Sequence, residues 1–309
     1  MRVISAFAAI SLGGAAYAAL TGSSHSFGHR HNHRRDQTSS DRWTMYESLM
    51  GDGLIDFFNF DEQASDNQGC TNYVDGKSSE LVYIQSDGKV RIGADQAEDV
   101  ALRNAIRMSS NETFNPSQNL LFIVDTRCPF TGSGTWSETG EIDLVEGVNS
   151  YTQNTTSVHS DNVNGANLNV AASEGGTNCD ANVNHQSCGV SVNGKTSFGQ
   201  VANDVNGATC WNTDHGPVDV NYGLPTPRSW GTPTFQIDSS TCNTSDHFKD
   251  LMLIINTNLA GLLTTASGEE QCCQDVTGFS DARSYVLSQG SAFGDSAAWV
   301  SNSIYIFMK

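Results

Sequence analysis

Residues 140–148 read Gly-Glu-Ile-Asp-Leu-Val-Glu-Gly-Val, which places three acids inside an apolar, β-prone run. Side chains of a strand alternate between its two faces, so Glu141 and Asp143 are expected on one face and the apolar residues on the other. Glu146 stands five places after Glu141, a spacing that puts it on the apolar face of a regular strand. One extra residue near Val145, a β-bulge, returns Glu146 to the acidic face, and bulges are over-represented beside active sites.

Three like charges on one face of a strand repel one another, and this repulsion raises the pKa of at least one carboxyl. A proton donor that works near neutral pH requires such a raised pKa. Retaining glycosidases hold two carboxyl groups about 5–5.5 Å apart, one as nucleophile and one as acid/base. The pattern therefore favours a catalytic strand over the alternative, a solvated strand face with ordinary surface acids.

The run Glu141–Glu146, with Gly140 before it and Gly147-Val148-Asn149 after it, resembles the catalytic strand of glycoside hydrolase family 16. It is similar to the bulged form of that strand in fungal laminarinases and mixed-linkage endo-β-glucanases. The resemblance implies that Glu141 is the nucleophile and Glu146 the acid/base. It also implies that Asp143 forms a hydrogen bond with the nucleophile. The implied fold is all-β: a jelly-roll, concanavalin-like β-sandwich with a concave carbohydrate-binding cleft. No cofactor and no metal in the active site are implied, and a structural calcium ion is left open.

Four further residues are candidates for substrate binding because their surroundings resemble cleft segments of the family: Asn72, Arg103, Trp136 and His159. Each has a simpler alternative. Trp136 would equally well fill the core, and a lone histidine such as His159 is often structural. Asn72 and Arg103 would be ordinary surface residues in most chains.

The chain is also shorter than the family pattern in places. Only Ser137–Gly140 separate Trp136 from Glu141, and the Cys-Gly and Trp-Ala-Gly segments expected after Asn256–Ala260 are absent. This shortening predicts either a divergent member with an open cleft or a chain that has lost segments of the domain.

Residues 41–309 are predicted to form one family-16-like catalytic domain, because short β-prone runs alternate with Gly, Asn, Asp and Ser clusters throughout. The predicted strands are 80–85, 89–93, 105–109, 120–126, 141–148, 155–160, 251–256 and 303–307. Only residues 96–105 suggest a helical turn.

The amino terminus predicts export. Residues 1–18 combine a positive start, an apolar middle and the small-residue site Ala16-Tyr17-Ala18, which is typical of a signal peptide. Residues 19–40 are rich in His and Arg and are expected to form a flexible tail. The eight cysteines indicate disulfides in a secreted protein, with the pairing left open. Acceptor motifs for N-glycosylation begin at Asn111, Asn154 and Asn243.

The formal net charge of −18 disfavours nucleic acid, anionic membranes and anionic polysaccharides as partners. A neutral β-glucan is the expected partner, and a monomer is expected. We therefore predict a secreted retaining endo-β-glucanase acting on 1,3- and 1,3-1,4-linked glucans. The alternatives are a cell-wall glucan transglycosylase of the same fold and a glucan-binding lectin. The five-residue spacing of the glutamates and the lack of a C-terminal apolar tail disfavour the transglycosylase, and the presence of both glutamates disfavours the lectin.

Overall fold

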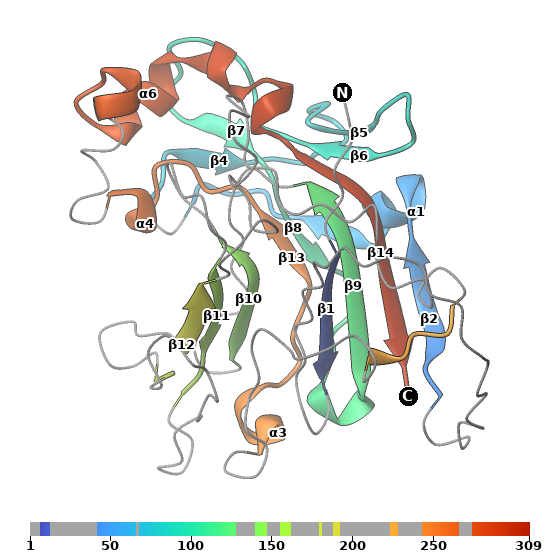
Figure 1. Cartoon of the computed structure of the whole chain (residues 1–309). Helices are drawn as coiled ribbons and strands as arrows, with labels where there is room; N and C mark the ends of the chain where they lie inside the picture. The colour runs from blue at the N-terminus through green and yellow to red at the C-terminus, as the bar shows by residue number, and fades with distance from the viewer. Residues whose placement is uncertain are drawn as a thin grey trace, which may run out of the picture.

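The computed structural model describes residues 7–12, 42–65, 68–127, 140–146, 155–161, 179–180, 188–191, 223–227, 243–265 and 274–309. Within these ranges the chain is built mainly from strands, as predicted (Figure 1). The strands are β1 (Phe7–Leu12), β2 (Thr44–Leu49), β3 (Phe58–Phe60), β4 (Thr71–Tyr73), β5 (Val82–Ile84), β6 (Val90–Ile92), β7 (Arg103–Ala105), β8 (Arg107–Ser110), β9 (Leu120–Arg127), β10 (Glu141–Glu146), β11 (Thr155–His159), β12 (Cys188–Ser191), β13 (Ile254–Asn256) and β14 (Trp299–Met308).

The helices are short. They are α1 (Gly51–Asp56), η2 (Pro116–Gln118), α3 (Thr244–His247), α4 (Leu262–Thr265), α6 (Ala282–Ser288), η4 (Gly290–Phe293) and η5 (Asp295–Ala297). Figure 1 shows α6 and its neighbours gathered at one end of the molecule, close to β4 and β7. Among the described helices, none is long and apolar enough to cross a lipid bilayer.

The largest sheet has the order β1-β9-β14-β6-β5, and β2 also pairs with β14. Its centre is β9 against β14, an antiparallel pair whose sequences are rich in β-branched and aromatic residues. Smaller sheets have the orders β13-β8-β3 and β10-β11-β12, and β4 pairs with β7 in parallel.

One hydrophobic core lies between these layers. The large sheet contributes fully or nearly fully buried side chains such as Ile92, Phe122 and Ile306. The smaller sheets contribute Met108 from β8 and Ile142 from β10 to the same cluster. Sheets that press their apolar faces on a shared core form a sandwich. The predicted fold class is therefore confirmed.

Local sequence explains the hairpin of β5 and β6. The predicted turn Ser86-Asp87-Gly88 lies between them, with Gly88 at φ +86°, a conformation that glycine adopts readily. The amide of Gln85 donates to the carbonyl of Lys89 at 2.8 Å, which closes the hairpin.

The helical turn predicted for residues 96–105 is wrong. Residues 103–105 form strand β7, and the stretch before it is irregular. The Asp95 carboxylate accepts hydrogen bonds from the amides of Ala97 (3.1 Å) and Asn104 (2.7 Å). Such bonds from a side chain to the backbone compete with helix formation.

Residues 7–12 belong to the segment predicted to be a signal peptide. In the structure they form β1, antiparallel to β9, with Phe7 opposite Asp125 and Leu12 opposite Leu120. Export, cleavage after residue 18, and glycosylation stay predictions. Two of the acceptor asparagines, Asn111 and Asn243, are exposed, and Asn154 lies outside the described residues.

Candidate active site

The acidic strand contains the predicted bulge. Strand β10 pairs antiparallel with β11, and the partners are Glu141 with His159, Asp143 with Ser157, and Glu146 with Thr155. Asp143 and Glu146 are three positions apart on β10, whereas their partners Ser157 and Thr155 are two positions apart on β11. The register therefore shifts by one residue between Asp143 and Glu146.

This register places the three acidic positions in one row. Positions 155, 157 and 159 of β11 alternate and thus share a face. Their partners on β10, positions 141, 143 and 146, share that face as well. The bulge therefore returns position 146 to the face of positions 141 and 143, as the sequence predicted.

The opposite face of β10 is apolar and anchors the strand. Ile142, Leu144 and Val145 pack against the main core cluster. This packing turns Glu141 and Asp143 away from the core, yet each is only 2% exposed. The two carboxyl groups are thus sheltered from water. In such a buried place charges interact more strongly than they do at the surface.

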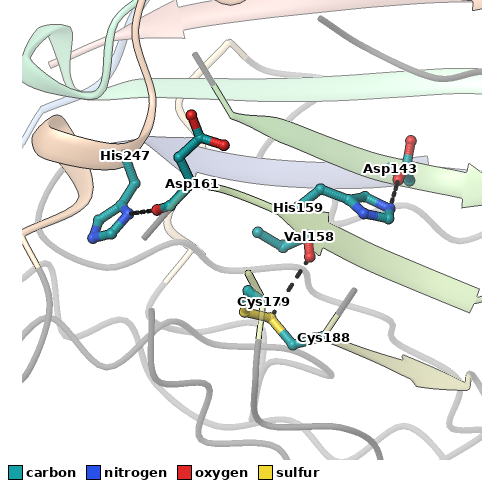
Figure 2. The surroundings of a disulfide bond; sticks show 7 residues. All are labelled: Asp143, Val158, His159, Asp161, Cys179, Cys188 and His247. Carbon is teal, nitrogen blue, oxygen red and sulfur yellow. Dashed lines mark hydrogen bonds and ion pairs between the residues drawn. A yellow bond between two sulfur atoms is a disulfide. The ribbon is translucent and has the colours of Figure 1, made fainter. Parts of the chain in front are cut away.

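His159 joins this acidic cluster from the neighbouring strand. Its Nε2 lies 3.4 Å from Oδ2 of Asp143 (Figure 2), an ion pair when the imidazole is protonated. Ligand atoms of Glu141, Asp143 and His159 all lie within 4.8 Å of one another, so these residues could also hold a metal ion. The structure thus places His159 beside two of the three acids, and its role in substrate binding stays a prediction.

A disulfide stabilises the strands next to His159. Cys179 and Cys188 are bonded, and Cys188 lies opposite Val158 in the β11–β12 ladder (Figure 2). The amide of Ser160 donates to the carbonyl of Cys179 at 2.9 Å. Closing a loop of this length stabilises a protein by about 3 kcal/mol in the chain-entropy account.

Cys70 is a buried free thiol whose Sγ lies 3.4 Å from the carbonyl oxygen of Leu259, and burial raises its pKa. It belongs to a smaller core cluster beside α6, away from the acidic row.

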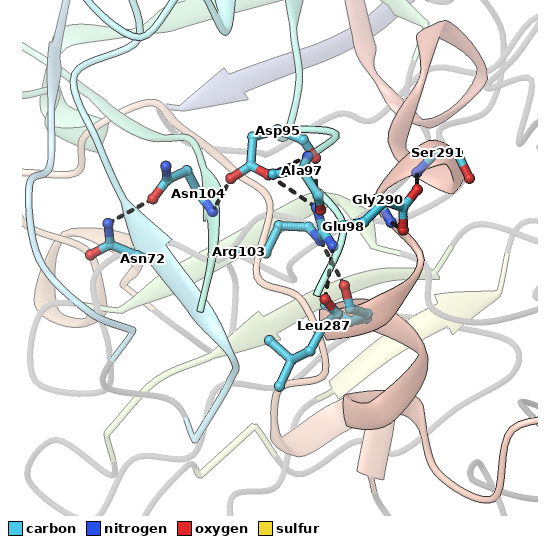
Figure 3. Close-up of polar contacts among 10 residues, drawn as sticks. Asn72, Asp95, Ala97, Glu98, Arg103, Asn104, Leu287, Gly290 and Ser291 are labelled. Carbon is cyan, nitrogen blue, oxygen red and sulfur yellow. Dashed lines mark hydrogen bonds and ion pairs between the residues drawn. The ribbon is translucent and has the colours of Figure 1, made fainter. Parts of the chain in front are cut away.

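The other predicted substrate-binding residues have different positions. Asn72 is half-buried on β4, and its amide donates to the side-chain oxygen of Asn104 at 2.8 Å (Figure 3). Arg103 is fully buried, and its guanidinium is surrounded by backbone carbonyls and Asp95 (Figure 3). A side chain so enclosed cannot reach a sugar, which corrects the suggestion drawn from the resemblance. Trp136 and the side chain of Glu146 lie outside what the structure describes.

Sequence reasoning missed Arg107. It stands on β8 opposite Asn256, on the face of its sheet turned away from the core residue Met108. The acids of β10 also point away from this core, so both sheets direct polar residues to the same side of their layer. Arg107 is half-buried, and its Nε lies 2.8 Å from Oδ2 of Asp61. The sequence did contain a signal for this position: side chains alternate along a strand, so a buried Met108 places Arg107 on the opposite face.

Comparison with known proteins gives the family. The model of the XgeA-like catalytic domain of glycoside hydrolase family 16 matches residues 58–307. The chain belongs to glycoside hydrolase family 16.

Curated relatives of this family 16 chain are named endo-1,3(4)-beta-glucanases. The endo-1,3(4)-beta-glucanase xgeA of Emericella nidulans is 25% identical over 305 residues, which cover 87% of the chain and 48% of that protein. An endo-1,3(4)-beta-glucanase of Arthroderma benhamiae is 25% identical over 297 residues, covering 82% of the chain and 62% of the relative. The chain thus spans about half the length of the first of these relatives and under two thirds of the second.

Solved structures share the family 16 fold. Laminarinase 16A from Phanerochaete chrysosporium, whose structure holds β-glucans in its donor and acceptor sites, superposes with a TM-score of 0.72 at 23% identity. It covers 86% of this chain, and the chain covers all of it (100%). An elongating family 16 β-1,3-glucosyltransferase superposes with a TM-score of 0.70 at 20% identity. These likenesses confirm the jelly-roll sandwich.

Proposed function

We propose that this family 16 chain is a retaining endo-β-glucanase that hydrolyses 1,3-linked and 1,3-1,4-linked β-glucans outside the cell. The observation that carries the proposal is the bulged register of β10 on β11, which places positions 141, 143 and 146 in one row. The names of the curated relatives support the substrate class. The Cys179–Cys188 disulfide supports an oxidising compartment. The working unit is a monomer that needs no cofactor.

In the proposed reaction Glu141 attacks the anomeric carbon while Glu146 protonates the leaving glycosidic oxygen. The bond from the anomeric carbon to that oxygen breaks as the bond to Glu141 forms. Glu146, now a carboxylate, then removes a proton from water, which displaces Glu141 and releases the sugar. Two inversions at one carbon leave its configuration unchanged.

Asp143 stands between the two glutamates in the row, buried and paired with His159. The family resemblance implies that Asp143 forms a hydrogen bond with the nucleophile. A protonated His159 would limit the accumulation of negative charge around Asp143. Burial strengthens both effects because water is excluded from the group.

The experiment that tests the proposal measures new reducing ends from laminarin, lichenan and xyloglucan under the same conditions. We expect activity on the first two substrates, and NMR of the initial product should show the β-anomer. Glu141→Gln should lower kcat by at least about 1,000-fold in a protein with unchanged circular dichroism, because the nucleophile is lost. Activity of this variant close to wild type, or an α-anomer as initial product, would contradict the mechanism.

Glucan transfer is the second candidate, and the elongating glucosyltransferase of this fold makes it worth testing. Transfer replaces water by another glucan chain in the second step. Size analysis of the same laminarin reactions separates the cases: longer chains without new reducing ends indicate transfer. Binding without any change in the polymer indicates a lectin.

A further inference from the structure

The segment that contains α3 touches the catalytic strand where that strand begins. Gly140 is buried and has φ +79°, and it immediately precedes Glu141. A Cβ atom at this position would overlap the ring of Phe248 and the backbone carbonyl oxygen of His247. Phe248 is itself 1% exposed. Residue 140 thus lacks a side chain because the α3 segment occupies that space.

His247 reaches the neighbouring strand. Its side chain is buried, 3% exposed, and its Nδ1 lies 3.2 Å from the backbone carbonyl oxygen of Asp161 (Figure 2). A carbonyl oxygen can only accept a hydrogen bond, so Nδ1 carries the hydrogen and donates it. Asp161 follows His159 by two residues on the chain that leaves β11.

These two contacts meet at one end of the β10–β11 ladder. Gly140 precedes Glu141, Asp161 follows His159, and Glu141 and His159 are direct partners in the register. His247 and Phe248 therefore hold both strands at the end that carries the candidate nucleophile and the imidazole.

The α3 segment is in turn tied to the main body of the fold. The side chain of Asn115 donates to Oδ1 of Asp250 and accepts from the amide of Asp250, both at 2.9 Å. The backbones of Phe114 and Leu251 exchange two hydrogen bonds of 2.8 and 2.9 Å. Phe114 packs edge-to-face on Phe122 of β9, with ring centroids 5.0 Å apart. The contacts of His247 thus connect the active-site strands to the largest sheet.

We propose that His247 is a positioning residue of the active site, and this inference rests on the proposed glucanase function. The described hydrogen bond of the imidazole goes to the backbone of Asp161 and to neither Glu141 nor Asp143. It acts through the carbonyl of Asp161 on the β11 end that carries His159, while Phe248 next to it fixes the start of β10. Catalysis depends on such fixation, because misplacement of a reacting group by about 1 Å can cost about 100-fold in rate.

Three substitutions separate positioning from mere packing. His247→Asn keeps an N–H donor at the place of Nδ1, His247→Gln moves it outward by one bond, and His247→Leu removes it. We expect His247→Leu to lower kcat on laminarin at least about 10-fold with KM changed less than about twofold, because substrate binding is intact while transition-state geometry is lost. His247→Asn should retain most of the wild-type kcat, and His247→Gln should be clearly less active than His247→Asn.

Hydrogen exchange gives a readout that does not depend on turnover. Amides in peptides covering residues 140–146 and 155–161 should exchange faster in His247→Leu than in wild type or His247→Asn. Peptides of β9 and β14 should keep their wild-type rates. A wild-type chain that hydrolyses no β-glucan would remove the proposed function, and hydrogen exchange would then decide the positioning role alone.

The proposal is overturned if kcat and exchange in His247→Leu match wild type, or if His247→Asn loses as much as His247→Leu. Equal acceleration of exchange in β9 and β14 would also overturn it, since that marks general loosening. If His247→Leu does not fold, the comparison of Asn with Gln decides: equal kcat and equal exchange in these two variants overturn the positioning role.

Discussion

Arg103 and Arg107 stand on β7 and β8, which follow each other in the chain but belong to different sheets, and only Arg107 keeps an exposed part. The Arg103 guanidinium and Nε donate to the backbone carbonyls of Asp95, Ala97, Val286 and Leu287 and to the Asp95 carboxylate. It also stacks over the ring of Phe293, 4.7 Å from the centroid. Arg103 thereby fastens α6 and η4 to strand β7, whereas Arg107 retains an exposed part beside Asp61.

This difference predicts opposite effects for matched substitutions. Arg103→Met leaves Asp95 and several carbonyls without their donor, so we expect the free energy of unfolding to fall by about 3–5 kcal/mol. KM for laminarin measured on the folded fraction should stay near wild type. Arg107→Met removes a partly exposed ion pair, which costs at most about 1 kcal/mol, and should raise KM because the residue lies on the polar side of its layer.

Urea unfolding and steady-state kinetics on both variants check this pair. A raised KM with unchanged stability in Arg103→Met would restore Arg103 as a sugar-contacting residue.

At the scale of elements, the helical region between residues 274 and 298 is held by carboxylates at helix starts. Asp281 caps α6 by accepting from the amide of Ser284 at 2.7 Å. Glu98, from the distant loop before β7, accepts from the amides of Gly290 (2.8 Å) and Ser291 (2.9 Å) at the start of η4 (Figure 3). The hydrogen bonds from Ser291 and Gly290 hold the pKa of Glu98 below its ordinary value.

These bonds predict a pH-dependent contribution of Glu98 to stability. A carboxyl whose pKa is lowered by folding stabilises the protein above its unfolded pKa, and this stabilisation is lost as the pH falls through the folded pKa. Glu98→Gln should therefore unfold at a lower temperature than wild type at neutral pH, and the difference should shrink below pH 4.5, the ordinary value of the group. Thermal unfolding of both proteins across this range checks it. A difference that stays constant down to the acid limit would show that the charge of Glu98 plays no part.

At the scale of the whole molecule, charge separates possible substrates. The chain has 34 acidic residues against 16 Lys and Arg, a formal net charge of −18. A neutral glucan meets no long-range force from this charge. An anionic glucan is repelled before it reaches the cleft, and salt screens that repulsion.

Laminarin and a carboxymethylated β-1,3-glucan of similar length form the matched test. We expect kcat/KM on the anionic polymer to rise at least about threefold between 0.01 and 0.15 M salt, as the Debye length falls from about 30 to about 8 Å. kcat/KM on laminarin should change by less than about 1.5-fold over the same range, because that polymer carries no charge. If kcat/KM changed equally with salt on both polymers, salt would be acting on the fold of the protein and not on the repulsion between the protein and the anionic polymer.

The sequence by itself determined the features whose cause lies within one element. Acids and apolar residues alternate along residues 141–146, and the odd spacing of Glu146 required the bulge that the structure contains between Asp143 and Glu146. The turn at residues 86–88 was equally local. A two-residue period and a turn signal are properties of adjacent residues, so they can be read without knowing the partners.

Only the tertiary structure decided which polar side chains keep an exposed part and which are enclosed. Arg103 and Arg107 have similar neighbours in sequence, and α6, which surrounds Arg103, comes from nearly the other end of the chain. The short strands β4 and β7 are stable because each pairs with the other, not because of their own residues. Gly140 reads as a simple turn residue until Phe248 is placed against it. Alternation tells which residues share a face, but only packing tells which face is buried.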